Sequence, residues 1–338
     1  MPGMPVAPLV APEPVVSVVM LNYRTPDWLR IAIPSLQKQT MADRMEIIVA
    51  DNGSGDESVA VARELGARVV EVGWNAGFAI GNNAGAAQAR GQHLFFVNTD
   101  MRFDERCVER LHERLEAEPR LFAADVMAYD WEGRTVTHGA TRLAPGGMRS
   151  WFPGTAVNFV AQWREPEYVP WGGAGNLMVR ADRFRALGGF DPTFFLDCED
   201  LDLCWRAWLR GWPTLFVPDA VLWHKGGGTT DSDVFRAEGR MAGWRHLSLE
   251  RNFQRFALKC LPAGTLPRVF LGKLAQSAGW LARGRPQEAA NIVRAMGTTL
   301  RHLPAILRER RAVGREAVIG RRALYRRLRA PPIEPAKW

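Results

Sequence analysis

The chain has 338 residues, a hydrophobic content of 47% and a net charge of +8. This length and composition fit one large α/β domain with an appendage, or two domains. The longest apolar runs fall short of the roughly 18 residues that a membrane-spanning helix needs, so we expect none.

The basic charge is confined to one stretch near the C-terminus. Residues 301–330 contain ten arginines and two glutamates, with no lysine or aspartate, so this stretch alone has a net charge of +8. The rest of the chain therefore sums to zero. A nucleic-acid-binding body would instead carry a basic stripe across its surface, so we expect no nucleic-acid partner.

The termini and the cysteines indicate a cytoplasmic protein. Prolines interrupt the first 14 residues, and no basic segment precedes them, so a signal peptide is not expected. The spacing of the four cysteines does not match a zinc site, and reduced thiols are the simplest interpretation. They are Cys107, Cys198, Cys204 and Cys260.

The first hundred residues alternate between buried strands and helices. Short apolar runs, β-branched at 15–21, predict strands at 15–21, 46–50, 68–72 and 93–97. Helical patterns fill the intervals at 26–37, 56–65 and 77–90. Short links between such elements predict a parallel α/β sheet, in which ligands bind beyond the carboxyl ends of the strands. Polar clusters follow three of these ends, at 22–24, 51–54 and 98–100.

Glycine patterns argue against two common nucleotide folds. The first strand–helix turn has no dinucleotide fingerprint, and the chain has no GxxxxGK[ST] phosphate loop. Glycines do recur at every fourth position, and this favours close helix packing over phosphate binding. They are Gly73, Gly77, Gly81 and Gly85.

The second part of the predicted domain is less regular. A solvated amphipathic helix is expected at 102–118, followed by an irregular stretch to 172 and a small-residue loop at 171–175. A strand at 176–179, a helix at 181–187 and short strands at 214–217 and 220–223 follow. His224 ends the last strand beside a glycine-rich loop, so a structural role and a ligand-binding role are both open.

An acidic segment at 194–212 predicts a helix that begins near Glu199. Four of its apolar residues share one helical face, Leu201, Cys204, Trp205 and Trp208. Glu199 and Asp200 would then lie in the first turn, at the edge of a core. A carboxylate beside apolar groups has a raised pKa, which suits it to accept a proton from a hydroxyl.

A purely structural interpretation of the same segment is also open. Asp197 could cap the helix, and acidic residues in its first turn favour the helix dipole. Asp202, Arg206 and Arg210 are spaced for i,i+4 pairs. For Asp202 this structural interpretation is the better one.

Seven stretches, in this order, resemble the family 2 glycosyltransferases of the GT-A fold, in their rhamnosyltransferase-like branch. The resemblance covers roughly residues 15–260. The stretches are VSVVMLNYRT from Val16, EIIVADNGSGD from Glu46, NAGFAIGNNAG from Asn75, FFVNTD from Phe95, GGAGNLMVRADRFRALGGFDPTFF from Gly172, EDLDLCWRAWLRGW from Glu199 and WHKGGG from Trp223. Such enzymes build bacterial cell-surface polysaccharides.

The resemblance implies inverting transfer from a nucleotide-diphospho-sugar. It implies that Asp51 accepts a hydrogen bond from N3–H of a uracil or thymine base. The other residues that it places around the nucleoside and phosphates are Asn22, Arg24, Asn75, Gly77, Asn82, Asn98 and Thr99.

The resemblance also implies a divalent metal and a catalytic base. Asp100 would bind Mg²⁺ or Mn²⁺, and His224 would complete the metal–diphosphate site. Asp200 would take the proton from the acceptor hydroxyl, supported by Glu199. The family's metal motif has acidic residues at both ends, but here Asn98 replaces the first.

No QxxRW motif follows the acidic helix, which favours transfer of a single sugar over polymerisation.

The expected organisation is an N-terminal segment (1–14), a GT-A domain (15–260), a helical appendage (261–330) and a tail (331–338). Residues 15–100 would form the nucleotide half of the domain and 101–260 the acceptor half. The appendage is basic and amphipathic, so it fits either an anionic membrane surface near a polyprenyl-linked glycan acceptor or an oligomer interface such as a homodimer.

Two other functions remain open at this point. A sugar nucleotidylyltransferase would need a glycine-rich loop after the first strand, where the chain has LNYRT instead. A non-catalytic nucleotide- or sugar-binding module of the same fold would keep the pocket and lose the reaction.

Overall fold

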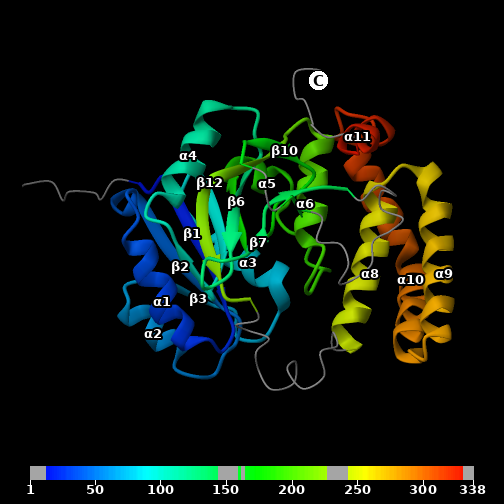
Figure 1. Cartoon of the computed structure of the whole chain (residues 1–338), viewed down its shortest axis with the longest axis horizontal. Coiled ribbons are helices and arrows are strands. Elements are labelled where there is room, and N and C mark those ends of the chain that lie inside the picture. The colour runs from blue at the N-terminus through cyan, green and yellow to red at the C-terminus, as the bar shows by residue number, and fades with distance from the viewer. Residues whose placement is uncertain (1–12, 144–158, 161–163, 227–242, 330–338) are drawn as a thin grey trace, which may run out of the picture.

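A computed structural model describes residues 13–143, 159–160, 164–226 and 243–329 (Figure 1). The expected tail (331–338) and all but the last two residues of the expected N-terminal segment (1–14) lie outside the described residues. Figure 1 shows helices packed around a central sheet, with a separate group of long helices beside it.

Ten strands of the described chain form the main sheet, in the order β10-β12-β6-β11-β4-β1-β2-β3, with β5 paired to β12 and β7 to β6. Their bounds are β1 (Val16–Asn22), β2 (Met45–Asp51), β3 (Arg68–Glu71), β4 (His93–Asn98), β5 (Met101–Phe103), β6 (Ala123–Tyr129), β7 (Val136–His138), β10 (Glu167–Val169), β11 (Asn176–Arg180) and β12 (Thr214–His224). A separate pair consists of β8 (Ala140–Thr141) and β9 (Phe159–Val160).

The sheet is mixed, with four parallel and five antiparallel strand pairs in the described chain, and this confirms the predicted α/β class. β1 pairs in parallel with β2 and β4, β2 with β3, and β6 with β12. β11 lies antiparallel between β4 and β6. The carboxyl ends of β1, β2 and β4 therefore meet at one edge of the sheet.

Helices cover both faces of the sheet, because successive residues of β1 point into two different hydrophobic cores. Val18 and Met20 of β1 belong to a core with α1, α2 and α4, whereas Val19 faces a core with α3, α5 and α6. This two-sided burial explains the near-continuous apolar runs of the strands. The bounds are α1 (Pro26–Gln37), α2 (Ser58–Glu64), α3 (Gly77–Ala87), α4 (Cys107–Ala117), α5 (Ala181–Ala186) and α6 (Glu199–Leu209).

The glycines of α3 allow that helix to lie close to the sheet. A Cβ on Gly85 would lie only 2.6 Å from Cγ1 of Val19, and a Cβ on Gly81 would clash with Leu21. The predicted helix-packing role is therefore confirmed for these two glycines.

Two sequence-based elements differ in the structure. Residues 101–103, at the start of the predicted 102–118 helix, form β5, because they pair with the end of β12. The predicted strands 214–217 and 220–223 are one strand, β12, with a register shift between Val217 and Val221. Local sequence patterns do not reveal either pairing, because both depend on residues more than ninety positions away.

The C-terminal helices form their own layer beside α6 (Figure 1). α8 (Gly243–Cys260) packs against α6, α9 and α10, and its buried Phe253 and Phe256 join the core of the main domain. The remaining helices are α9 (Leu266–Ala282), α10 (Pro286–Arg315) and α11 (Arg321–Leu328). Among the described residues, none of the helices combines the length and hydropathy required to cross a bilayer.

Candidate active site

A cavity of about 520 Å³ opens at the carboxyl edge of the parallel strands. Segments that are far apart in the sequence converge on it. They are the ends of β1, β2, β4 and β12, the start of α3, the 173–175 loop, the segment from Phe195 to Asp200, and the start of α8. This is the position at which open α/β sheets bind ligands.

Eight of the predicted site residues line this cavity together. They are Asn75, Gly77, Asn98, Thr99, Asp100, Glu199, Asp200 and His224. The structure therefore places the two predicted metal ligands and the two predicted catalytic carboxylates around one space. Their chemical roles remain predictions.

The other four predicted donor-binding residues lie outside the cavity lining. Asn22 Nδ2 donates to Asp51 Oδ1 at 2.8 Å and to Ser54 Oγ at 3.0 Å. Arg24, which has a φ of 56°, donates from its backbone N–H to Ser54 Oγ. Asn82 Nδ2 donates to the carbonyl of Phe78, and its buried Oδ1 has no hydrogen-bond partner within the described chain. These residues fix the shape of the turns behind the cavity wall.

Asp100 and His224 meet because two strands pair. β5 is antiparallel to β12, with Met101 opposite His224, and Lys225 N–H donates to the carbonyl of Asp100 at 3.0 Å. His224 Nε2 consequently lies 3.2 Å from Asp100 Oδ1. The Asp100 side chain is only 6% exposed, whereas His224 is partly open to the cavity.

The acidic helix α6 begins at Glu199, as predicted, but the predicted cap at Asp197 is wrong. Cys198 is the N-cap residue, and both Asp197 and Cys198 have left-handed backbones, with φ of 72° and 71°. Such conformations are strained for residues other than glycine. This turn directs Glu199 and Asp200 toward the cavity, while the buried face of α6 packs inward.

Helix α8 holds this strained turn in place. Arg245 donates from Nη2 and Nε to the two carboxylate oxygens of Asp197, at 2.9 and 3.1 Å. Asn252 is fully buried and donates through Nδ2 to the carbonyls of Leu196 and Asp197. Contacts from α8 thereby compensate the conformational cost of the turn.

The electrostatics of the first turn of α6 suit proton transfer. Burial, with the neighbouring carboxylate of Asp197, raises the pKa of Asp200 to about 6, against backbone hydrogen bonds from Leu201 and Ala174. Burial and the charges of Asp200 and Asp197 raise the pKa of Glu199 well above its usual range. The raised pKa of Glu199 favours its neutral form. An aspartate with a pKa near 6 is both ionised and basic at neutral pH.

Asp202, two residues beyond Asp200, has a different role. It is fully buried and forms the expected i,i+4 pair with Arg206, with Arg206 Nε at 2.7 Å from its Oδ2. Lys259 of α8 lies 2.7 Å from its other oxygen and 2.6 Å from Asp191. This ion network connects α6 to α8 away from the cavity, so the structural interpretation of Asp202 is confirmed. Arg210 instead pairs with Glu316.

Sequence reasoning missed the contributions of α8 and β6. Trp244 and Arg245 of α8 line the cavity, although no motif marks them. Asp125 of β6 is buried, accepts from His138 Nε2 at 2.7 Å and from Asn176 Nδ2 at 3.0 Å, and so supports the 173–175 loop. Burial opposes a charge on His138, but the carboxylates of Asp125 and Asp200 outweigh it and raise the pKa of His138.

Parts of the chain are similar to known glycosyltransferases. Residues 17–175 match the family described as Glycosyl transferase family 2. An N-acetylglucosaminyl-diphospho-decaprenol L-rhamnosyltransferase of Mycobacterium tuberculosis (strain H37Rv) is 28% identical over 267 residues, which cover 68% of this chain and 87% of that protein.

Two solved structures share the fold at low sequence identity. The mannosyltransferase PcManGT from Pyrobaculum calidifontis, in complex with GDP-Man and Mn²⁺, has a TM-score of 0.54 and 16% identity, covering 92% of this chain and 86% of that one. GalNAc-T7 with UDP, GalNAc and Mn²⁺ has a TM-score of 0.58 and 14% identity, covering 87% of this chain and 58% of that one. The chain therefore shares the GT-A fold of these two structures, its residues 17–175 match Glycosyl transferase family 2, and it is similar to an L-rhamnosyltransferase.

Proposed function

We propose that the chain transfers a single sugar, with inversion, from a nucleotide-diphospho-sugar to a hydroxyl of a lipid-linked or cell-surface glycan. The observation that carries the proposal is the shared cavity, which Asp200 lines together with Asp100 and His224. A base and a diphosphate site must face one another across the sugar for a direct displacement to occur.

Asp200 is the proposed catalytic base. Its carboxylate takes the proton of the acceptor hydroxyl while that oxygen bonds to the anomeric carbon and the bond from this carbon to the phosphate oxygen breaks. The nucleoside diphosphate leaves with the bonding electron pair. The raised pKa of Glu199 favours its neutral form, which limits the negative charge beside the reacting oxygen. Its Oε2 is buried without a hydrogen-bond partner in the described chain, so the carboxyl group is available to contact the acceptor.

Asp100 and His224 would hold a divalent cation. Their facing atoms are 3.2 Å apart, close to the roughly 3 Å between neighbouring ligands of an octahedral ion with bonds of about 2.1 Å. One carboxylate oxygen and one imidazole nitrogen suit Mn²⁺ at least as well as Mg²⁺. When bound, the cation would neutralise charge on the leaving diphosphate. Asn98 supplies no charge, so we expect the ion to bind mainly together with the donor.

The relatives suggest the substrates. The mycobacterial protein is an L-rhamnosyltransferase that acts on a diphospho-decaprenol-linked sugar. We therefore propose dTDP-L-rhamnose as the donor, with UDP-sugars as the alternative, and a polyprenyl-diphosphate-linked glycan as the acceptor. The absence of QxxRW after α6 supports transfer of one residue.

The donor is tested by thermal shift. A panel of dTDP- and UDP-sugars is titrated with and without Mn²⁺, because a ligand that binds the folded state alone raises the melting temperature. Asp100→Ala should lose the Mn²⁺-dependent part of the shift, whereas the control Asp219→Ala, at an exposed site away from the cavity, should keep it. An unchanged shift in Asp100→Ala would refute the metal assignment.

Transfer itself distinguishes an enzyme from a binding module. With the best donor and a polyprenyl-diphospho-sugar analogue, the wild type should form product that Asp200→Asn does not, while both bind the donor. Equal donor binding without turnover in the wild type would favour the non-catalytic module. Formation of a nucleotide-sugar from a sugar phosphate would favour a nucleotidylyltransferase.

We also propose that the C-terminal helices bind an anionic membrane surface. α9 exposes an apolar stripe of Leu271, Leu274 and Leu281, with exposed fractions of 47% to 65%, and Leu300 of α10 is 67% exposed. The exposed arginines Arg268, Arg283, Arg294, Arg301 and Arg308 accompany these residues. Arginines beside an apolar face favour an anionic bilayer, where each contributes about 1 kcal/mol. Val269 of α9 is buried, so the exposed stripe begins at Leu271.

Vesicle sedimentation tests this surface. Vesicles with phosphatidylglycerol should retain the wild type, and Leu271→Asn with Leu274→Asn and Leu281→Asn should release it. Val318→Asn is the matched control, because Val318 is 75% exposed outside both helices. Unchanged sedimentation would refute membrane binding. Loss of a dimer in the triple variant would instead identify an oligomer interface.

A further inference from the structure

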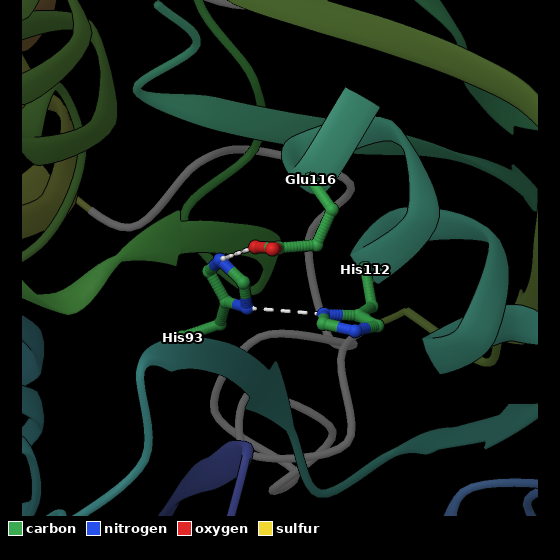
Figure 2. Close-up of side chains that lie close together, drawn as sticks. All are labelled: His93, His112 and Glu116. Atoms are coloured by element: carbon green, nitrogen blue, oxygen red, sulfur yellow. Dashed lines mark hydrogen bonds and ion pairs between the residues drawn. The ribbon is translucent and has the colours of Figure 1, made fainter. Parts of the chain in front are cut away.

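Three metal-ligating side chains meet on the side of the sheet away from the cavity. His93 begins β4, and His112 and Glu116 lie on α4 (Figure 2). His93 Nδ1 lies 3.3 Å from His112 Nδ1, and His93 Nε2 lies 3.4 Å from Glu116 Oε1. One potential ligand atom from each residue lies within 4.8 Å of the other two.

The fold positions this cluster independently of the cavity. His112 and Glu116 are four residues apart, so they share one face of α4 and lie one turn from each other. Leu111 and Leu115 bury the adjoining face against the sheet, where α4 packs mainly over β12, β6 and β11. Asn98, which lines the cavity, is five residues from His93, or roughly 16 Å along the strand.

The chemistry of the three groups favours a transition metal. Burial and the nearby charges of His112 and Arg180 lower the pKa of His93 to about 4, and burial also lowers that of His112. Both imidazoles are therefore neutral at neutral pH, the form that binds metals. Two imidazole nitrogens and one carboxylate oxygen are ligands that suit Zn²⁺ and not Mg²⁺.

The geometry agrees with a four-coordinate ion. Two ligands of a tetrahedral Zn²⁺, with bonds of about 2.0 Å, are separated by roughly 3.3 Å, and the two facing Nδ1 atoms have this separation. Glu116 has a side chain that is 51% exposed, so its carboxylate can turn toward the same point. It also lies 3.9 Å from Arg180 Nη1, an ion pair that metal binding would have to displace.

We propose that His93, His112 and Glu116 form a second divalent-metal site, selective for Zn²⁺, with a solvent molecule as the fourth ligand. The site joins the start of β4 to α4. Its role is structural, because it lies far from the reacting groups, and it is independent of the cation proposed at Asp100 and His224.

Zn²⁺ titration of the full chain in excess Mg²⁺ tests the proposal. Calorimetry should detect one Zn²⁺ per chain, and the melting temperature should rise with Zn²⁺ concentration. His112→Asn and Glu116→Gln should each weaken binding by at least about tenfold. Neither residue is fully buried, so both variants are expected to fold. His302→Asn is the matched control, since His302 is an exposed histidine on α10.

A second pair of measurements separates this site from the cavity. Asp100→Asn should retain the Zn²⁺ signal, and Co²⁺ added to the wild type should give the strong visible absorption of a tetrahedral centre, absent in His112→Asn. The proposal is overturned if Zn²⁺ does not bind in excess Mg²⁺, if binding is lost in Asp100→Asn, or if His112→Asn and Glu116→Gln bind as the wild type does. In each case His93 and His112 form only a hydrogen bond between neutral rings.

Discussion

The first turn of α6 contains acidic residues in two contrasting environments. Asp202 has no exposed surface, yet Arg206 and Lys259 lie within 2.7 Å of its two oxygens. Glu199 and Asp200 face the cavity, next to a third carboxylate, Asp197, whose cation partner Arg245 comes from α8. Within one helical turn, Asp202 is therefore paired with two cations, whereas the pKa values of Glu199 and Asp200 are raised.

This contrast shows how one helix supports both stability and chemistry. A buried carboxylate is tolerated when cations compensate it, and then it cannot act as a base. A carboxylate that must accept a proton has to lack such compensation, and the rest of the structure must hold it in place. Here the Asp202 network anchors α6, while Arg245 and Asn252 hold the turn that precedes Asp200.

Asp200→Asn should give the largest effect. The amide cannot take the acceptor proton, so we expect kcat for transfer to fall by about a thousandfold. Donor binding should persist, and the melting temperature should not fall, because a neutral amide avoids the cost of burying a charge. Initial rates and thermal shift measure both. A comparable loss in Asp219→Asn, at an exposed position, would contradict the assignment.

Lys259→Met should affect stability instead. Removal of the shared cation leaves Asp191 and Asp202 each with one cation fewer, and we expect the free energy of unfolding to fall by about 3 kcal/mol. Urea denaturation measures it. The folded fraction should keep the pH profile of the wild type. A stability change below about 1 kcal/mol would show that the remaining cations, Arg206 at Asp202 and Arg255 at Asp191, compensate the two carboxylates on their own.

The pH profile sharpens the comparison further. The pKa of Asp200 is raised to about 6, and the ionised form is the base, so activity should increase through pH 6 and level off above it. One unit below that pKa, at about pH 5, kcat should be about tenfold under the plateau. The folded protein is monitored by circular dichroism at each pH. A flat profile between pH 5 and 8 would exclude Asp200 as the titrating base.

Glu199→Gln should have the smallest effect. Burial and its charged neighbours raise the pKa of Glu199 and favour its neutral form, and glutamine is neutral with nearly the same shape. We expect less than about a tenfold loss of kcat. A loss as large as that of Asp200→Asn would transfer the role of base to Glu199.

Much of the sheet and of the cavity could be predicted from the sequence. Continuous apolar runs predicted β1, β2 and β4, because strands that are buried on both faces must be apolar throughout. The polar residues after these strands, such as Asn98 and Asp100, meet at one edge because parallel strands end together. Local pattern alone is enough for such elements.

The rest depends on long-range pairing. β5 forms because Met101–Phe103 lies against the end of β12, and this same pairing brings Asp100 to His224. The resemblance to a family supplied that pair, whereas the local pattern predicted a helix. Trp244 and Arg245 carry no local signal, because their place in the cavity follows from the packing of α8 on α6. The cluster of His93, His112 and Glu116 was also not predicted from the sequence, since its members come from two elements.

The left-handed turn at Asp197 and Cys198 has a consequence for recombination between relatives. The turn and the helix that secures it are separated by more than forty residues, and neither is useful without the other. A chimaera with its crossover between α6 and α8 would take the turn at Asp197 from one parent and α8 from the other. The positions of Arg245 and Asn252, which hold the turn, would then come from the second parent. Functional chimaeras of such enzymes should therefore inherit both segments from the same parent.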